Sequence, residues 1–296
     1  MSSFRSRIAL IFISLLSLFA CHDTTETADN IGTGADTTKN EAKGETKNVF
    51  YSVPSPIEMG SLLKRSGASY NLKILNPVEN ISKYSSSEAK ALNLGVYGTD
   101  MSVASIFEQN QETILYLRCV SKLAKSIGIS GAFDENTALR IEENEGNKDS
   151  LLQIISEAYW DADAFLKQEG RQNVSGLIIA GGWIEGLYIA TQIAEKVKNN
   201  EEIITRIGEQ KLSLRNLIKL IEAGKEDSPL PPVLDDLKAL GVIYDKVESS
   251  KAPIEVKAEP EKKMITLSST SKMIVSAEQF SEIKTKVESI RNNIIK

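Results

Sequence analysis

The sequence predicts an all-α fold, built as an antiparallel multi-helix bundle. From about residue 55 onward, apolar residues recur with a period near 3.6, the period of a helix with one buried face. The periodic segments begin at recurrent capping sequences and are joined by short loops with Gly or Pro, which favours antiparallel neighbours. The 296 residues are 41% hydrophobic and only 6% aromatic, which is enough for the core of one or two globular domains.

Helix starts are predicted at four capping sequences. Ser55 and Asn76 each precede a Pro at the first helical position, and Ser85 and Ser276 open capping boxes. A Glu follows three residues after each of the first three caps, and we interpret these acids as caps rather than catalytic groups: Glu58, Glu79 and Glu88. The predicted helices cover residues 56–66, 86–97, 101–127, 134–145, 149–169, 174–198, 202–223, 231–248 and 276–295, in a helical domain spanning 49–250.

The segment 174–194 is the most apolar in this body, with Glu185 as its only charged residue. A helix that is apolar on all sides is buried in a protein core or crosses a membrane. We favour the core, because a central Glu is expensive in lipid. Within the predicted helix 101–127, Cys119 flanks the core stripe, so we interpret it as a small buried hydrophobe rather than a nucleophile.

Residues 251–275 interrupt the helical pattern. Alternation around Ile254 and apolar pairs near Ile265 and Ile274 permit a small β-hairpin, with a charged linker as the alternative, since two isolated strands are marginal in water. Residues 276–296 form the last predicted helix, whose apolar side chains make a narrow seam. We expect the seam to dock on the bundle, with pairing to a second molecule as the alternative. The seam consists of Phe280, Ile283, Val287, Ile290 and Ile294.

Residues 1–20 have the pattern of a secretory signal peptide. Arg5 and Arg7 form a cationic start, and a 12-residue apolar core follows. This core is too short for an ordinary membrane-spanning helix of roughly 20 residues, and a short uncleaved anchor is the alternative. Residues 21–48 are predicted to be a flexible tether, because seven Thr and six acids follow the Cys with almost no apolar residues.

The end of this signal, Leu18-Phe19-Ala20-Cys21, resembles the lipobox of bacterial lipoproteins. The resemblance implies that Cys21 carries fatty acids such as palmitate, becomes the first residue of the mature chain, and makes the membrane a partner through a lipid anchor. It also implies that His22, in place of Asp after the Cys, directs the protein to the outer membrane, on its periplasmic or its surface face. The helical body is similar to uncharacterised helical envelope lipoproteins of Gram-negative bacteria.

Composition excludes several functional classes. A net charge of −5 without a basic block argues against nucleic acid as a partner. The chain has two Cys, at positions 21 and 119, and one His, His22 in the tether, which excludes a disulfide scaffold, a zinc finger and Ser–His catalysis in the folded part. Four S-x-x-K matches lack the S-D-N and K-T-G companions of penicillin-recognising enzymes. The sequence predicts no metal site and no cofactor.

Two functions of different classes remain. The first is a non-enzymatic, membrane-anchored helical lipoprotein of the cell envelope that binds a small molecule, a glycan or a partner protein. The alternative is a carboxylate-dependent envelope enzyme such as a glycan-cleaving hydrolase, since two carboxyl groups can do that chemistry without His. We favour the first, because no catalytic motif rises above chance.

Glu185 is the residue on which the site prediction depends. An ionised carboxylate buried without a partner is costly, so Glu185 must be protonated, hydrogen-bonded or paired. One interpretation pairs Glu185 and the similarly placed Asp161 with an Arg, such as Arg118 or Arg140, or with a Tyr hydroxyl. The other places both acids beside a Trp in one polar pocket, which suits a sugar or a cation. Its candidate ligand-binding residues are Glu185, Asp161, Trp183 and Trp160.

Overall fold

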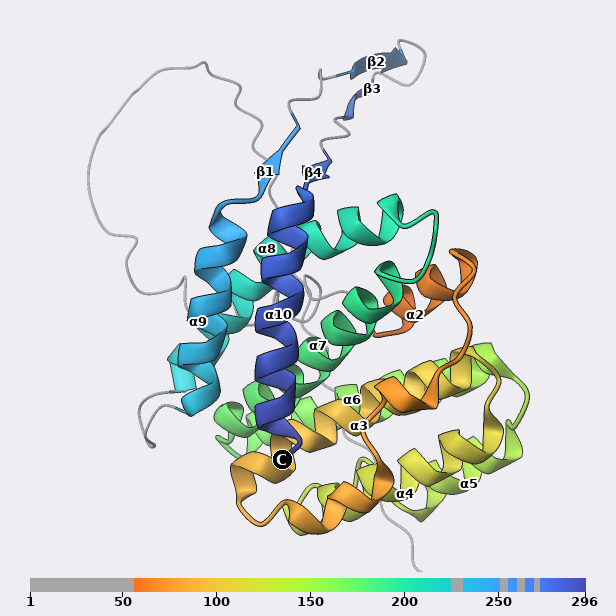
Figure 1. The fold of residues 1–296 in the computed structure, drawn as a ribbon. Helices are drawn as coiled ribbons and strands as arrows, with labels where there is room; N and C mark the ends of the chain where they lie inside the picture. Colours follow the sequence, from red (N-terminus) through yellow and green to blue (C-terminus); the bar gives the residue numbers. More distant parts are fainter. Residues whose placement is uncertain (1–55, 225–230, 251–254, 260–263, 269–271) are drawn as a thin grey trace, which may run out of the picture. The chain divides into compact units, whose positions relative to one another are not determined.

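A computed structural model describes residues 56–224, 231–250, 255–259, 264–268 and 272–296. The predicted signal peptide, the tether and Cys21 lie outside them. The described chain is a multi-helix bundle, which confirms the predicted all-α class (Figure 1). Its α-helices are α2 Pro56–Arg65, α3 Ser87–Ile106, α4 Asn110–Ser126, α5 Glu135–Glu143, α6 Lys148–Gln168, α7 Gln172–Ala194, α8 Glu201–Ala223, α9 Pro232–Asp245 and α10 Ala277–Ile294; short 3₁₀ helices are η1 Leu72–Ile74 and η2 Val78–Lys83.

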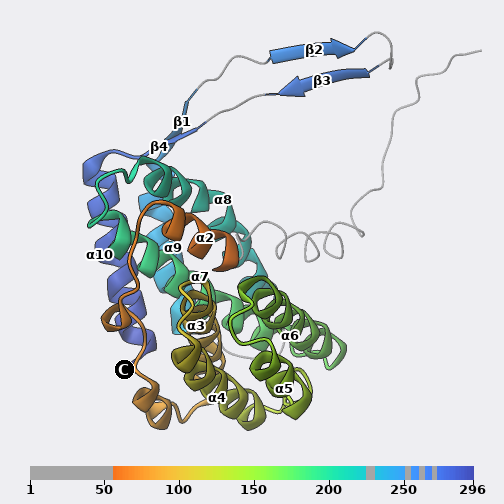
Figure 2. The ribbon, with the colours of Figure 1, turned by 90° about the vertical axis from the view of Figure 1, so that its right-hand side faces the viewer.

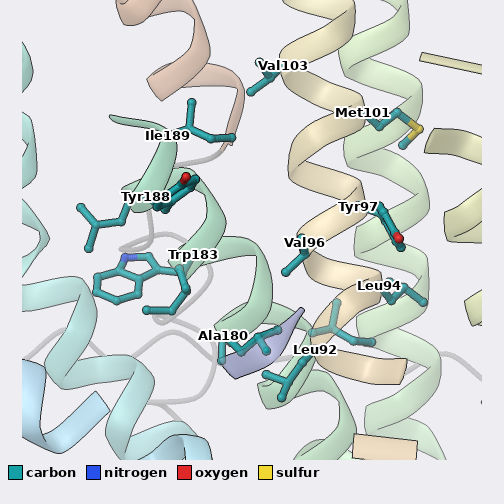
Figure 3. Close-up of a cluster of buried hydrophobic side chains, with 14 of the residues drawn as sticks. Leu92, Leu94, Val96, Tyr97, Met101, Val103, Ala180, Trp183, Tyr188 and Ile189 are labelled. Carbon is teal, nitrogen blue, oxygen red and sulfur yellow. The ribbon is translucent and has the colours of Figure 1, made fainter. Parts of the chain in front are cut away.

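Helices α3 and α7 pack against each other at the centre of the bundle (Figure 1). Their backbones approach closely, because a Cβ at Gly95 would overlap the carbonyl oxygen of Ile178 and a Cβ at Gly181 would overlap that of Leu92. Large apolar side chains from both helices surround this contact (Figure 3). Each Gly weakens its helix by roughly 1 kcal/mol relative to Ala, and the close packing offsets that loss.

Burial inside the bundle explains the apolar composition of α7. Among the described residues, α7 is the one helix with the length and apolarity of a membrane span, and 78% of its most apolar window is buried by the rest of the protein. Extensive burial of this kind is typical of a core helix, which is the interpretation favoured from the sequence.

The predicted boundary between helices 86–97 and 101–127 is wrong. Helix α3 continues through Met101 to Ile106, and α4 begins only at Asn110. Between them Glu108 adopts a left-handed φ of 60°. The N–H groups of Glu108 and Gln109 bond back to carbonyl oxygens of α3, at 3.0 and 2.8 Å, which closes the helix with a Schellman motif.

A contact from α2 compensates for the unusual residue in this motif. Lys64 donates from Nζ to the carbonyl oxygen of Ile106 at 2.9 Å and to Oε1 of Glu108 at 2.7 Å. Left-handed positions at helix ends usually carry Gly, which signals the end in a sequence. A Glu at this position gives no such signal, and its partner lies 44 residues earlier.

Short strands precede α10, so the hairpin alternative holds for this segment. Strand β2, Glu255–Glu259, pairs antiparallel with β3, Met264–Ser268, in the register that sets Lys257 opposite Thr266 (Figure 2). Strand β1, Glu248–Ser249, pairs antiparallel with β4, Met273–Ile274.

Helix α10 begins at the capping box expected from the sequence. Oγ of Ser276 accepts the N–H of Gln279 at 3.1 Å, and Oε1 of Gln279 accepts the N–H of Ser276 at 2.9 Å. The helix packs against α7, α9 and α3. Its inner face is fully buried at Ile283, Val287 and Ile290.

Candidate functional site

Glu185 lies fully buried in α7 and pairs with Arg291 of α10. Nε of Arg291 donates to Oε2 of Glu185 at 3.0 Å, and Nη2 donates to Oε1 at 3.2 Å, which makes a two-pronged ion pair. The partner is an arginine, as one interpretation of the sequence expected, but it is neither Arg118 nor Arg140. Arg140 instead pairs with Glu157 near the surface, at 2.6 Å.

A second carboxyl group, Asp100 of α3, belongs to the same cluster and is also fully buried. Its Oδ2 accepts the backbone N–H of Asn76 at 3.1 Å. No N–H or hydroxyl group of the described residues donates to its Oδ1. The charge of Glu185 acts on Asp100, and a hydrogen bond between the two carboxyl groups requires a proton on one of them.

The surroundings place that proton on Asp100. Burial raises the pKa of Asp100 well above its usual range, and the negative charge of Glu185 raises it further, against the lowering effects of the Asn76 N–H and of Arg291. Burial also raises the pKa of Glu185, but the charge and hydrogen bonds of Arg291 oppose this directly. We call Asp100, Glu185 and Arg291 the buried ion cluster. In this cluster Asp100 is neutral, Glu185 is ionised and Arg291 is charged.

Arg291 is held by more than the carboxylate. Nη2 also donates to the carbonyl oxygen of Ile74 at 3.2 Å, and the guanidinium lies 4.6 Å from the centre of the Tyr188 ring. Burial acts to lower the pKa of Arg291, but the attraction and hydrogen bonds of Glu185 outweigh it, so the pKa is raised. The guanidinium therefore stays charged although it is only 6% exposed.

An asparagine network extends from the buried ion cluster to the end of α10. Asn76 donates from Nδ2 to the hydroxyl of Tyr84 at 3.0 Å and accepts from Asn80 at 2.8 Å. Asn93 donates to the carbonyl oxygen of Ile294 at 2.8 Å. The predicted role of Asn76 as a helix cap is therefore wrong, because its side chain is used in the core and η2 begins without a side-chain cap.

The structure does not bring Glu185 and Asp161 into one pocket. Asp161 is exposed on α6, whereas Glu185 is enclosed by α3 and α10. Trp183 is buried and donates from Nε1 to Oε1 of Gln210 at 3.0 Å, whereas Trp160 is 54% exposed. Asp161 lies at the border of the buried face of α6, where periodicity does not distinguish an inward residue from an outward one.

Sequence reasoning missed Asp163, the acid that α6 does bury. Asp163 accepts a hydrogen bond from the hydroxyl of Ser175 at 2.5 Å and forms an ion pair with Lys167 at 2.6 Å. This arrangement ties α6 to α7 and uses both carboxylate oxygens. A Lys four residues after an acid is the sequence signal that was available for it.

Cys119 is buried, at 5% exposed, as expected for a small core residue. Burial raises the pKa of its thiol to about 11, so the thiol is protonated and unreactive at neutral pH. Among the described residues, no group of three or more His, Cys, Asp or Glu side chains is arranged to hold a metal ion.

A shallow hollow of about 170 Å³ lies between α8 and α9. Its three cations are already engaged: Arg215 with Asp245 at 2.7 Å, Lys238 with Glu222 at 2.7 Å, and Lys211 with the carbonyl oxygen of Val247 at 2.8 Å. The arrangement holds the two helices together and leaves these charges partly neutralised.

Comparisons with protein-family models, with curated proteins and with solved structures give no match for this chain.

Proposed function

We propose that this chain is a non-enzymatic, lipid-anchored helical protein of the bacterial cell envelope, which presents its bundle to a small molecule, a glycan or a partner protein. The observation that carries the proposal is the order of residues at the N-terminus: two Arg, a short apolar core, and then Ala20 and Cys21. The acidic, Thr-rich residues that follow suit a spacer between membrane and bundle.

The buried ion cluster supports a structural role for the carboxyl groups over glycan cleavage. A glycosidase needs two carboxyl groups that flank a sugar, with room for the scissile bond between them. Asp100 and Glu185 are instead both 0% exposed, and Arg291 occupies both oxygens of Glu185. This pair therefore serves the packing of three helices.

The outer face of α6 supports a binding role. Trp160 is 54% exposed, Phe165 is 42% exposed, and the exposed carboxylate of Asp161 lies between them in the sequence. Asp161 and Phe165 are four residues apart and so are neighbours on the helix surface, and an aromatic ring beside an acid suits a sugar ring or a cation. The proposal assigns the ligand to this face rather than to Glu185 and Trp183.

Replacing Cys21 tests the proposal. Wild-type protein is expected to incorporate labelled palmitate and to sediment with membranes, whereas Cys21→Ala should lose the label and move to the soluble fraction. Cys119→Ala is the matched control, because it removes the other Cys of the chain and should leave labelling unchanged. Equal labelling of wild type and Cys21→Ala would refute the lipid anchor.

A further inference from the structure

Three helices bring three charged side chains together inside the bundle. Asp100 comes from α3, Glu185 from α7 and Arg291 from α10, and each is 6% exposed or less. Two carboxylates and one guanidinium would carry a net charge of −1, which is costly to bury. One bound proton makes the cluster neutral, and Oδ1 of Asp100, a buried oxygen without a hydrogen-bond partner among the described residues, is available to carry it.

Helix α10 packs over the buried ion cluster. Arg291 bonds to Glu185 and to the carbonyl oxygen of Ile74, and the carbonyl oxygen of Ile294 accepts from Asn93 of α3. The segments that connect α3, α4, α6 and α7 do not pass through α10, so α10 can move away without breaking those connections. Its movement would admit water to both carboxyl groups.

The other ion pairs of α10 lie near the surface and are weak. The three pairs are Lys284 with Glu195, Lys286 with Asp236 and Glu282 with Lys246, at 2.6, 2.7 and 2.8 Å. All six side chains are partly exposed, and pairs of this kind contribute little. The apolar inner face and the buried ion cluster therefore decide whether α10 stays docked.

We propose that the single proton held between Asp100 and Glu185 controls the docking of α10, so that the helix is seated while the proton is bound and opens increasingly as the pH rises. The inference is independent of the lipid anchor, since it concerns only residues of the bundle.

The direction follows from proton linkage. A carboxyl group whose pKa is raised in the closed state binds a proton there that the open, hydrated state releases. Above the usual pKa of an aspartic acid, about 4, each further pH unit therefore favours opening by up to tenfold in the equilibrium constant. The effect ends at the raised pKa of Asp100, above which both states have lost the proton.

The phenols and the thiol near the buried ion cluster do not titrate over this range. Burial raises the pKa of the surrounding phenols and of the Cys119 thiol, so these groups remain neutral. Three acids lie near these groups. The charge of Glu112 in α4 acts on Tyr70, that of Glu79 in η2 acts on the Cys119 thiol, and that of Glu288 in α10 acts on Tyr188. The phenols are Tyr70, Tyr84, Tyr97, Tyr116, Tyr159 and Tyr188.

The test is hydrogen exchange of the α10 amides in the full chain between pH 5 and pH 9, corrected for the intrinsic pH dependence of exchange. In the wild type, protection of α10 should fall as the pH rises, while protection of α3 and α7 is retained. Asp100→Asn keeps an acceptor for the Asn76 N–H and a donor for Glu185 without a proton to lose. In this variant α10 should be protected equally across the range.

A second variant and a control complete the test. Glu185→Gln removes the negative charge that raises the pKa of Asp100 further, so the pH dependence should weaken and shift to lower pH, whereas the part that burial causes should remain. Asp161→Asn, at an exposed position of α6, should keep the wild-type dependence. The proposal is overturned if Asp100→Asn and wild type lose protection in parallel, if α10 is equally protected at all pH values in the wild type, or if all helices open together.

Discussion

Arg291 pairs with the buried carboxylate of Glu185, and its removal would leave that negative charge without a cation to balance it. Breaking a buried ion pair from one side costs roughly 3–5 kcal/mol, since the remaining charge loses its compensation. We therefore expect Arg291→Met to lower the free energy of unfolding by about that amount at pH 7, measured by urea denaturation.

The matched control for this change is Arg215→Met. Arg215 pairs with Asp245 at 2.7 Å, but both side chains are more than half exposed. An exposed pair contributes at most about 1 kcal/mol, so this variant should unfold almost as the wild type does. Equal effects of the two substitutions would contradict the assignment of Arg291 to a buried ion cluster. At pH 4 the loss from Arg291→Met should shrink, because both buried carboxyl groups can then be protonated.

Single residues show where sequence reasoning succeeds and where it stops. A charge in an apolar helix predicts that Glu185 has a partner, because the cost of burying a lone charge is independent of the fold. The identity of that partner depends on packing: Arg291 lies 106 residues away in sequence, and Asp100 sits in a segment where its burial has no periodic signal. Asn76 was likewise interpreted from local capping chemistry, and a tertiary network overrides that chemistry.

At the scale of elements, the close contact between α3 and α7 depends on glycines, which have no Cβ atom. The Gly95→Ala substitution would add a methyl group against the carbonyl oxygen of Ile178, which belongs to the backbone and cannot rotate away. Overpacking of this kind costs about 1–3 kcal/mol or more, and it outweighs the gain in helix propensity. We expect the thermal midpoint to fall, as measured by circular dichroism.

Gly131→Ala serves as the comparison for that substitution. A Cβ at Gly131 meets no atom within 4 Å, so its effect on stability should stay within about 0.5 kcal/mol. A Gly95→Ala variant as stable as Gly131→Ala would show that α3 and α7 do not pack this closely.

Helix positions were predictable from periodicity and caps, but the end of α3 was not. The expected helices from residue 134 onward agree with α5 to α10 within a few residues at each end, because apolar stripes and caps are local properties. The α3–α4 boundary depends on Lys64 of α2, which satisfies the Ile106 carbonyl and pairs with Glu108. A helix end that is stabilised from a distant helix leaves no local pattern to recognise.

At the scale of the whole molecule, α10 contributes both apolar surface and the charge that balances the core. Deleting residues 276–296 would expose the inner face of α3, α7 and α9 to water and leave two buried acids without Arg291. The truncated chain is expected to lose much of its thermal stability, in contrast to a chain that lacks only residues 295–296, which follow the helix. Circular dichroism melting of the two truncations measures the difference.

Adding α10 back as a separate peptide distinguishes docking from mere destabilisation. A synthetic peptide of residues 276–296 binds only the folded bundle, so it should raise the melting temperature of the truncated chain in proportion to the logarithm of its concentration. The same peptide with Met in place of Arg291 keeps the apolar seam and should restore less. The alternative role, pairing of α10 with a second molecule, makes the opposite prediction: truncation would abolish a dimer seen by size-exclusion chromatography and leave the melting temperature unchanged.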